Sequence, residues 1–350
     1  MRQSRELLCH FLPPDRLTSE RCTTLGGRIA EPPLVSVIIA TRNRAALLTQ
    51  TLDAICGQRW PAERIEIIVA DNGSTDDTRR VVEAAGQHAD SPSFRYLYIA
   101  EPGKSNAVNA ALQCARGDLF AFTDDDVLPE PSWIERIVSA FAETNCDFVT
   151  GRILPRWETA PPRWLSRSLY GALSVLDNGE TRLAIGAGGS SDVMALGGNT
   201  AVRSHVIARL GGLRTDLGSL HGTLRTGEDH EFFLRMVHAG CRGTYEPTAV
   251  VRHWVPRERL TPAYFWRWLY QNGRAVARLE SSYPLAVARL LRVPRYLWRE
   301  AAANAWLAVR YVVGGNRGSG LAAALRVVWF GGYIREAWLG RTRIASGGRV

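Results

Sequence analysis

The chain has 350 residues, of which 46% are hydrophobic and 22% charged, values typical of a globular protein that buries a full core. Its six cysteines are scattered and form no Cys-x-x-Cys pair, which argues against a zinc site or a disulfide framework and favours a reducing cytoplasm. No long apolar core follows the basic start of the chain, so a signal peptide is not expected.

The formal net charge of +9 is unevenly distributed along the chain. Residues 252–350 contain 17 arginines and four glutamates, a net charge of +13, whereas residues 1–251 carry −4. A strongly basic region indicates an anionic partner, either a membrane surface or a nucleic acid. Because the sequence contains no helix-turn-helix, RRM or zinc-finger pattern, we expect a membrane surface and no nucleic acid.

Strands and helices are expected to alternate from residue 34 onward, after an N-terminal arm at residues 1–33 that has no clear periodicity. Short apolar runs rich in β-branched residues indicate buried strands. Thr75 is expected to cap the helix after the second strand. The alternation predicts a parallel α/β sheet. The predicted strands are 34–40, 65–70, 94–99 and 119–123, and the predicted helices include 45–57 and 103–116.

Polar clusters follow three of these strands. Thr41–Arg44 comes after the first strand, Asp71-Asn72 after the second and Asp124–Asp126 after the fourth. Ligands of parallel sheets bind at the carboxyl ends of the strands. Because these three clusters are expected on one rim, the sequence predicts a nucleotide pocket there.

The three adjacent aspartates, Asp124–Asp126, repel one another unless a positive charge lies among them. A hard divalent cation such as Mg²⁺ or Mn²⁺ prefers oxygen ligands, and Mg²⁺ is usually held by one or two carboxylates together with substrate phosphates. The stretch is therefore interpreted as a clamp for a metal and a diphosphate. The alternative is an acidic loop solvated at the surface.

The remaining half of the chain gives a mixed pattern. Strands are expected at 146–154 and 249–254, and helices from Ser204 and near Glu228. Residues 155–192 are irregular and rich in Pro, Trp and Gly. They are expected to form either a loop that closes over a substrate or a surface excursion.

The pattern becomes helical after Pro256. Apolar side chains recur on one face over residues 265–279, with arginines on another face. Two further apolar runs, 301–313 and 321–334, are shorter than the ~20 residues of a membrane span. Seven of the eleven tryptophans also lie in the last hundred residues. Arginine and tryptophan on amphipathic helices are typical of a helix in a membrane interface, and the alternative is ordinary packing against the sheet.

A series of short motifs occurs in order along the chain: Val35–Asn43, Val69–Asp76, Gly103–Asn109, Asp124–Asp126, Gly198-Asn199, Glu228-Asp229 and His253. Together they resemble the inverting family 2 glycosyltransferases. The resemblance implies the GT-A fold, a Rossmann-like α/β architecture whose mixed, mainly parallel sheet is flanked by helices. It places a catalytic domain at 34–256 and leaves 257–350 as a basic, tryptophan-rich amphipathic helical region.

The resemblance implies transfer of a sugar from a nucleotide diphosphate to an acceptor hydroxyl, with inversion at the anomeric carbon. Family members often have a second aspartate where this chain has Asn72. An amide carbonyl still accepts from a pyrimidine N–H, so UDP or dTDP is the favoured nucleotide. Lys104, the only lysine, is expected to meet the donor phosphates. The implied donor-binding residues are Thr41, Arg42, Asn43, Asp71, Asn72, Lys104, Asp124, Asp125 and Asn199.

The same resemblance implies that Asp126 coordinates Mn²⁺ or Mg²⁺ and that Asp124 and His253 complete the metal site. Such an ion would stabilise the charge that builds on the leaving diphosphate. Asp229 is implied to be the general base, because an aspartate is ordinarily ionised at neutral pH. Glu228 would orient the acceptor or its loop, and both carboxylates would also suit a helix N-terminus.

The expected acceptor is a glycan or a lipid-linked sugar in cell-surface glycan or glycolipid synthesis. The expected location is the cytoplasm, peripheral on the inner face of the cell membrane. Two other functions would each explain part of the sequence. A sugar nucleotidyltransferase would need a glycine-rich loop where this chain has Ala40–Arg44. A non-catalytic membrane-surface module would explain the basic region and leave Asp229 and His253 without a role.

Overall fold

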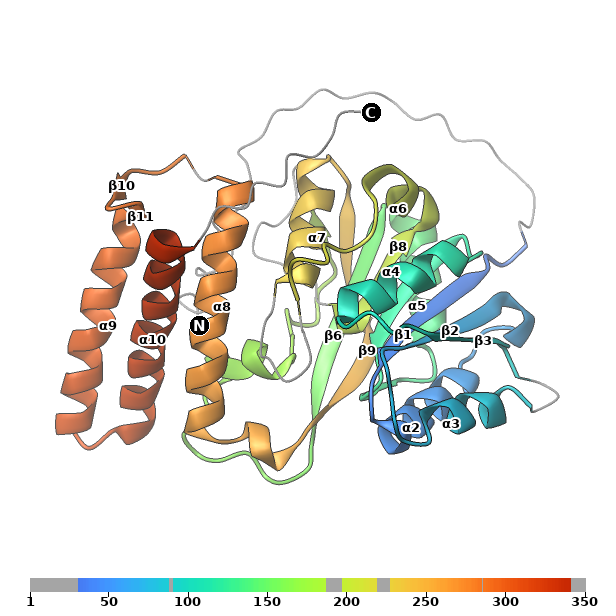
Figure 1. Ribbon diagram of the computed structural model, residues 1–350, viewed down its shortest axis with the longest axis horizontal. Coiled ribbons are helices and arrows are strands. Elements are labelled where there is room, and N and C mark those ends of the chain that lie inside the picture. The colour runs from blue at the N-terminus through green and yellow to red at the C-terminus, as the bar shows by residue number, and fades with distance from the viewer. Residues whose placement is uncertain (1–30, 88–90, 187–196, 219–226, 285, 341–350) are drawn as a thin grey trace.

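The computed structural model describes residues 31–340, apart from 88–90, 187–196, 219–226 and 285. A central mixed sheet is covered by helices on both faces, and long helices from the C-terminal region form a further layer at one side (Figure 1). Residues 1–30 of the predicted arm lie outside the described residues, and so do residues 187–192 of the predicted irregular segment.

The first four long strands form the parallel half of the sheet, in the spatial order β3-β2-β1-β4. Both β1 and β2 are almost completely buried, as expected for parallel strands covered on both faces. All four predicted strands are confirmed, with small shifts at their ends. Their bounds are β1 Val35–Thr41, β2 Ile65–Asp71, β3 Ser93–Tyr98 and β4 Leu119–Asp124.

The second half of the sheet is mixed because β8 runs antiparallel between β4 and β6. The short strands β5, β7 and β8 were not predicted, because three or four residues are too few to show the two-residue alternation of a strand. The central parts of β6 and β9 were predicted. The bounds are β5 Val127–Pro129, β6 Phe148–Trp157, β7 Leu183–Ile185, β8 Thr200–Arg203 and β9 Gly243–Val255.

Helices α2, α3 and α5 cover one face of the sheet, and α4, α6 and α7 cover the other. Leu48, Leu52 and Ile55 of α2 are buried on the predicted face. The prediction that Thr75 caps a helix was wrong, because α3 begins later and its backbone N-cap is Asp77. The helices span α2 Ala45–Cys56, α3 Thr78–Ala85, α4 Lys104–Cys114, α5 Trp133–Thr144, α6 Ser204–Leu210 and α7 Glu228–His238.

The C-terminal helices α8 (Pro262–Ser282) and α10 (Arg317–Leu339) pack against the rest of the protein. Their apolar residues share one cluster with Leu234 of α7 and another with Val255 of β9. Only glycine allows the two helices to approach so closely, since a Cβ on Gly273 would lie 2.0 Å from the carbonyl oxygen of Trp329. Within the described residues, no helix combines the length and apolarity needed to cross a bilayer.

Candidate active site

The three predicted polar clusters lie on one rim of the sheet. In the strand register Thr41 lies opposite Asp71, and Ala40 lies opposite Asp124. The carboxyl ends of β1, β2 and β4 therefore bring Thr41, the Asp71-Asn72 pair and the three aspartates together. The predicted common rim is confirmed.

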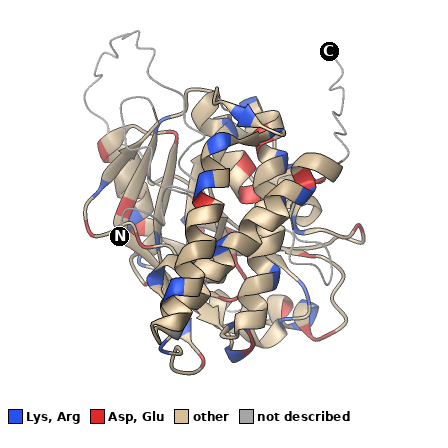
Figure 2. Ribbon diagram, turned by 90° about the vertical axis from the view of Figure 1, so that its left-hand side faces the viewer, with Lys and Arg blue, Asp and Glu red and all other residues tan. Residues whose placement is uncertain are grey.

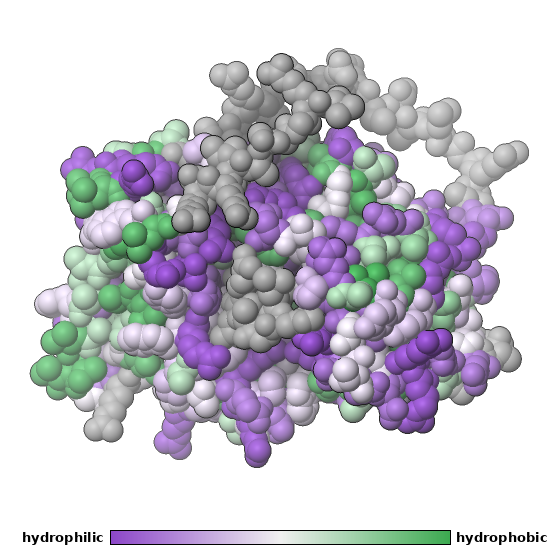
Figure 3. Space-filling view, in the orientation of Figure 1, coloured by the Kyte–Doolittle hydropathy of each residue, from purple (hydrophilic) through white to green (hydrophobic). Residues whose placement is uncertain are grey.

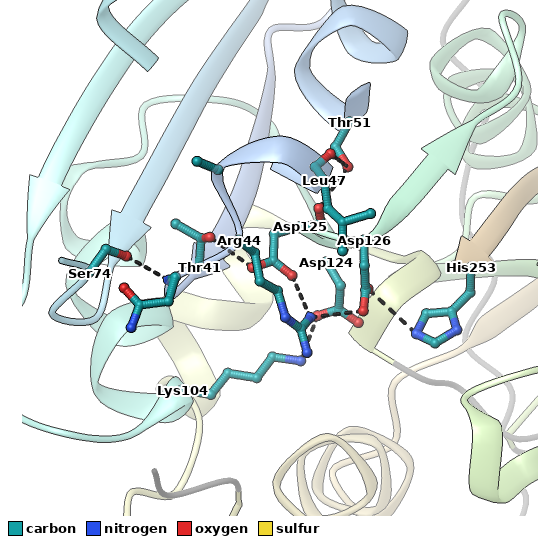
Figure 4. A network of polar contacts seen from close by, with 12 residues as sticks. Thr41, Arg44, Leu47, Thr51, Ser74, Lys104, Asp124, Asp125, Asp126 and His253 are labelled. Carbon is teal, nitrogen blue, oxygen red and sulfur yellow. Dashed lines mark hydrogen bonds and ion pairs between the residues drawn. The ribbon is translucent and has the colours of Figure 1, made fainter. Parts of the chain in front are cut away.

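Each of the three adjacent aspartates has a cationic partner (Figure 4). The guanidinium of Arg44 lies 2.8 Å from Asp125 Oδ1 and 2.8 Å from Asp126 Oδ2. The ammonium of Lys104 lies 2.7 Å from Asp124 Oδ1. Burial alone would raise the pKa of the Asp124 carboxyl, but Lys104 lowers that pKa below its usual range. The cluster is therefore held by two cationic side chains and is not a solvated acidic loop.

Arg44 is a site residue that the sequence analysis missed in favour of its neighbour Arg42, which is exposed. One signal could have identified it. Arg44 occupies the N-cap position of α2, where a positive charge opposes the helix dipole. A basic residue placed there suggests a specific acidic partner, and here that partner is the aspartate cluster.

Asp125 is buried, as is Asp126. Burial, together with the neighbouring Asp126, raises the pKa of its carboxyl to about 6. Its charged form is favoured by Arg44 and by Thr41, whose Oγ1 donates a 2.7 Å hydrogen bond to Asp125 Oδ2. Thr41 thus holds Asp125 in place, and any contact with a nucleoside remains a prediction.

Asp71 and Asn43 organise the neighbouring loop of the rim. Asp71 Oδ1 accepts from Ser74 N–H, and Asp71 Oδ2 accepts from the hydroxyl of Tyr96, each at 2.7 Å. Asn43 Oδ1 accepts from Thr75 N–H at 2.7 Å. Asn43 adopts a left-handed backbone, with φ of 52°, which asparagine tolerates better than most residues.

Asn72 is committed to the chain itself. Its amide nitrogen donates to the carbonyl oxygens of Ile99 and Glu101, and its amide oxygen accepts from Gly103 N–H at 2.7 Å. The structure therefore gives Asn72 the task of positioning the loop that starts α4. Binding of the base by this side chain, which the resemblance implied, has no support in these contacts.

Asn199 is a buried structural hub rather than a group facing an open pocket. It is 1% exposed, and its amide nitrogen donates to the carbonyl oxygens of Arg152 and Ala249 at 2.8 Å each. Its amide oxygen accepts from the indole N–H of Trp133 at 2.8 Å. Every hydrogen-bonding group of its amide is used within the core, which favours a structural role, and the implied donor-binding role stays a prediction.

Asn199→Ala is expected to lower the free energy of unfolding by about 3 kcal/mol, because it leaves three buried polar groups without a partner. Denaturant unfolding measures the change, and Asn304→Ala, on the long helix α9 (Arg295–Val313), is a control expected to have little effect. Unchanged stability combined with a raised KM for the donor would support a donor-binding role for Asn199.

Lys104 links the aspartate cluster to Asp229. Its ammonium, bonded to Asp124, lies 3.9 Å from Asp229 Oδ2. Burial alone would lower the pKa of Lys104, but Asp124 and Asp229 raise it well above its usual value. The two carboxylates also share a glycine pair: a Cβ on Gly197 would lie 2.5 Å from Asp229 Oδ1, and one on Gly198 would lie 3.0 Å from Asp124 Oδ2. The resemblance implied that both carboxylates belong to one active site, and the structure brings them close together.

Glu228 differs from its neighbour Asp229 in its surroundings. It begins α7 and is 6% exposed. Burial first, and the nearby charge of Asp229 second, raise the pKa of Glu228 to about 7. Asp229 also lines a small, mostly apolar pocket formed by side chains of β4 and α7, including Phe122 and Phe232. Glu228 therefore keeps its proton up to about neutral pH.

Glu228→Gln is expected to stabilise the protein at pH 8 by on the order of 2–3 kcal/mol and to have little effect at pH 4. The unfolded chain loses this proton near pH 4.5, whereas the folded protein keeps it until about pH 7. The contribution of Glu228 to stability is therefore lost as pH rises through this window. Thermal unfolding against pH measures it, with the exposed Glu101→Gln as control. A gain that does not depend on pH would contradict the assignment.

Asp126 and His253 form the part of the site that best suits a metal. His253 Nε2 lies 3.4 Å from Asp126 Oδ1, close to the spacing of about 3 Å between neighbouring ligands of an octahedral ion. Burial lowers the pKa of His253, which keeps its ring in the neutral form that binds metals. Among the described residues, no cluster of three or more His, Cys, Asp or Glu side chains could hold an ion alone. An ion held by these two side chains would therefore need diphosphate and water to complete an octahedral shell.

Comparison with known sequences gives one family. The profile described as glycosyl transferase family 2 matches residues 36–210, half of the chain. Validoxylamine A glucosyltransferase of Streptomyces hygroscopicus subsp. jinggangensis is 36% identical over 118 residues, which cover 33% of this chain and 27% of the relative. Succinoglycan biosynthesis protein ExoM of Rhizobium meliloti is 28% identical over 237 residues, which cover 66% of this chain and 71% of ExoM.

Two solved structures show the same fold. A mannosyltransferase from Pyrobaculum calidifontis, solved with GDP-Man and Mn²⁺, superposes with a TM-score of 0.62 at 20% identity and covers 88% of each chain. Residues 1–349 of S. aureus TarS, solved with UDP, superpose with a TM-score of 0.51 at 16% identity, covering 85% of this chain and 90% of the fragment.

Proposed function

Because this chain belongs to glycosyl transferase family 2 and has the GT-A fold, we propose that it transfers a sugar from a nucleotide diphosphate to an acceptor hydroxyl with inversion at the anomeric carbon. One observation carries the proposal furthest. The ammonium of Lys104 lies within 3.9 Å of both the aspartate cluster and Asp229. This proximity supports a site in which groups suited to a leaving diphosphate lie beside a carboxylate suited to receiving a proton.

Asp229 is the proposed general base and takes the proton of the acceptor hydroxyl as that oxygen attacks the anomeric carbon. Glu228, which keeps its proton near neutral pH, is proposed to orient the acceptor by donating a hydrogen bond. Lys104 and Arg44 supply positive charge on the side where the diphosphate leaves. Asp126 and His253 would hold the divalent ion, with Asp124 nearby, and the bound ion would stabilise the diphosphate as it leaves.

The proposed acceptor is a glycan or a lipid-linked sugar used in cell-surface glycan synthesis. The similarity to ExoM, named for succinoglycan biosynthesis, supports this class. The proposed location is peripheral, on the cytoplasmic face of a membrane, and the basic C-terminal region supports it. A nucleotidyltransferase is not favoured, since the loop after β1 has no glycine and its Arg44 is paired with Asp125 and Asp126.

Calorimetric titration with UDP, dTDP and GDP, each with and without Mn²⁺, tests the donor site. We expect one of these nucleotides to bind, and to bind more tightly when Mn²⁺ is present. UDP or dTDP is favoured, and GDP is included because a structural neighbour was solved with GDP-Man. The corresponding monophosphate is the matched control, because a clamp for a diphosphate should discriminate against it. Absence of metal-dependent binding for all three would contradict the proposed clamp.

A further inference from the structure

The outward face of α9 is apolar, and most of its surface is exposed among the described residues. Leu297 is the one residue of α9 that is fully buried. Trp306 is 60% exposed and Val313 is 83% exposed, and both belong to a stripe spaced at three or four residues. Figure 3 shows hydrophobic surface at the lower left, over the end of α9. We call this stripe the α9 face, formed by Ala302, Ala305, Trp306, Val309, Val312 and Val313.

Arginines surround the α9 face. The guanidinium of Arg310 lies 5.1 Å from the centre of the Trp306 ring. Arg295 and Arg299 are exposed on the first turns of the same helix, and Arg292 is exposed on the hairpin before it. Within the described part of the chain, none of these four arginines is held in an ion pair. Figure 2 looks at this side of the molecule and shows basic residues along the helices nearest the viewer.

The remaining C-terminal helices are different. Arg274 and Arg278 of α8 are paired with Glu336 of α10, and the apolar residues of these two helices fill the shared clusters. The packing alternative of the sequence analysis therefore accounts for α8 and α10. Single large apolar residues of α8 and α10, such as Trp266 and Leu339, are also exposed, whereas α9 carries a continuous stripe of exposed apolar residues.

We propose that the α9 face binds the surface of an anionic lipid bilayer, with Trp306 and the valines entering the interface and the arginines meeting lipid phosphates. A second copy of the chain fits less well, because a self-complementary contact through this face would bring the same arginines together. The inference gives the proposed membrane location a specific surface. It rests on that part of the proposed function and is independent of the catalytic assignments.

Vesicle flotation of the full chain tests the proposal, using phosphatidylcholine alone and phosphatidylcholine with phosphatidylglycerol. We expect binding to the anionic vesicles and at least tenfold weaker binding by a Trp306→Glu, Val313→Glu double variant. Arg299→Glu is expected to weaken binding to anionic vesicles by about fivefold or more. Tyr98→Glu is the matched control, because Tyr98 is 61% exposed on β3, at the opposite edge of the molecule.

Three outcomes would overturn the proposal: equal binding to neutral and anionic vesicles, unchanged binding by the double variant, or a concentration-dependent dimer that the double variant abolishes. The last outcome would assign the face to a second copy. Transfer to a soluble acceptor, and thermal unfolding, are measured on the α9 variants. Both are expected to stay unchanged, so that a failed membrane assignment is distinguishable from a failed catalytic one.

Discussion

Asp229→Asn is expected to lower the rate of sugar transfer by about 10³-fold or more while nucleotide binding stays within a few-fold of wild type. The amide keeps the size of the side chain and cannot accept the proton of the acceptor hydroxyl. Because Lys104 keeps its closer partner Asp124, at 2.7 Å, the donor side of the site should persist. Transfer rates and calorimetric titration of the same preparation give the two quantities.

Glu228→Gln is the matched control for this experiment, since it makes the same chemical change on the adjacent residue of α7. We expect that variant to retain far more activity, because a glutamine can still donate a hydrogen bond as a protonated Glu228 does. If Asp229→Asn lost nucleotide binding and transfer in the same proportion, Asp229 would belong to the donor site. If Glu228→Gln were the inactive variant, the two roles would be exchanged.

Asp126→Asn is expected to remove the effect of Mn²⁺ on donor binding, with a loss of affinity of about 100-fold in the presence of the metal. The carboxylate of Asp126 faces His253 on one side and Arg44 on the other (Figure 4). An amide supplies a weaker, neutral ligand and also frees Arg44 from one of its partners. Nucleotide titration at a series of Mn²⁺ concentrations separates the loss of metal dependence from a general loss of binding.

Asp125→Asn is the control for the metal assignment, because Asp125 is adjacent in sequence and is held by Thr41 and Arg44. Its substitution should weaken the loop and leave the metal dependence in place. The reverse pattern, with metal dependence lost in Asp125→Asn and kept in Asp126→Asn, would show that the ligand has been assigned to the wrong carboxylate.

The rim of the sheet was predictable because buried parallel strands leave a strong apolar signal and their ends then have defined positions. Val37 and Ile39 of β1 are fully buried, and Thr41 lies where the run of apolar residues predicts the strand end. Only the family resemblance assigned the carboxylates Asp124 and Asp229 to the same site. No sequence spacing predicts a contact between residues so far apart. The close approach of Gly197 to Asp229 and of Gly198 to Asp124 is visible only in the structure.

Residue type and family motif did not reveal which groups the asparagines and the arginines contact. Asn72 and Asn199 belong to family motifs, yet both amides are used within the protein. A side-chain amide can hydrogen-bond a ligand or a buried carbonyl equally well, so only its surroundings in the folded protein determine which partner it has. Arg42 and Arg44 flank one residue, and the start of α2 directs only Arg44 toward the aspartates. The C-terminal helices illustrate the same limit, because similar apolar stripes face the core in α8 and solvent in α9.

The position of Lys104 gives the candidate active site its own spectroscopic probe. It is the single lysine of the chain, and its side chain is 25% exposed between Asp124 and Asp229. Protein grown with ¹⁵N-labelled lysine would therefore give one side-chain ammonium signal, and that signal would come from the site itself. Because Asp124 and Asp229 outweigh the effect of burial and raise the pKa of Lys104 well above its usual value, the ammonium stays protonated, and amine-directed reagents should leave it unmodified at neutral pH.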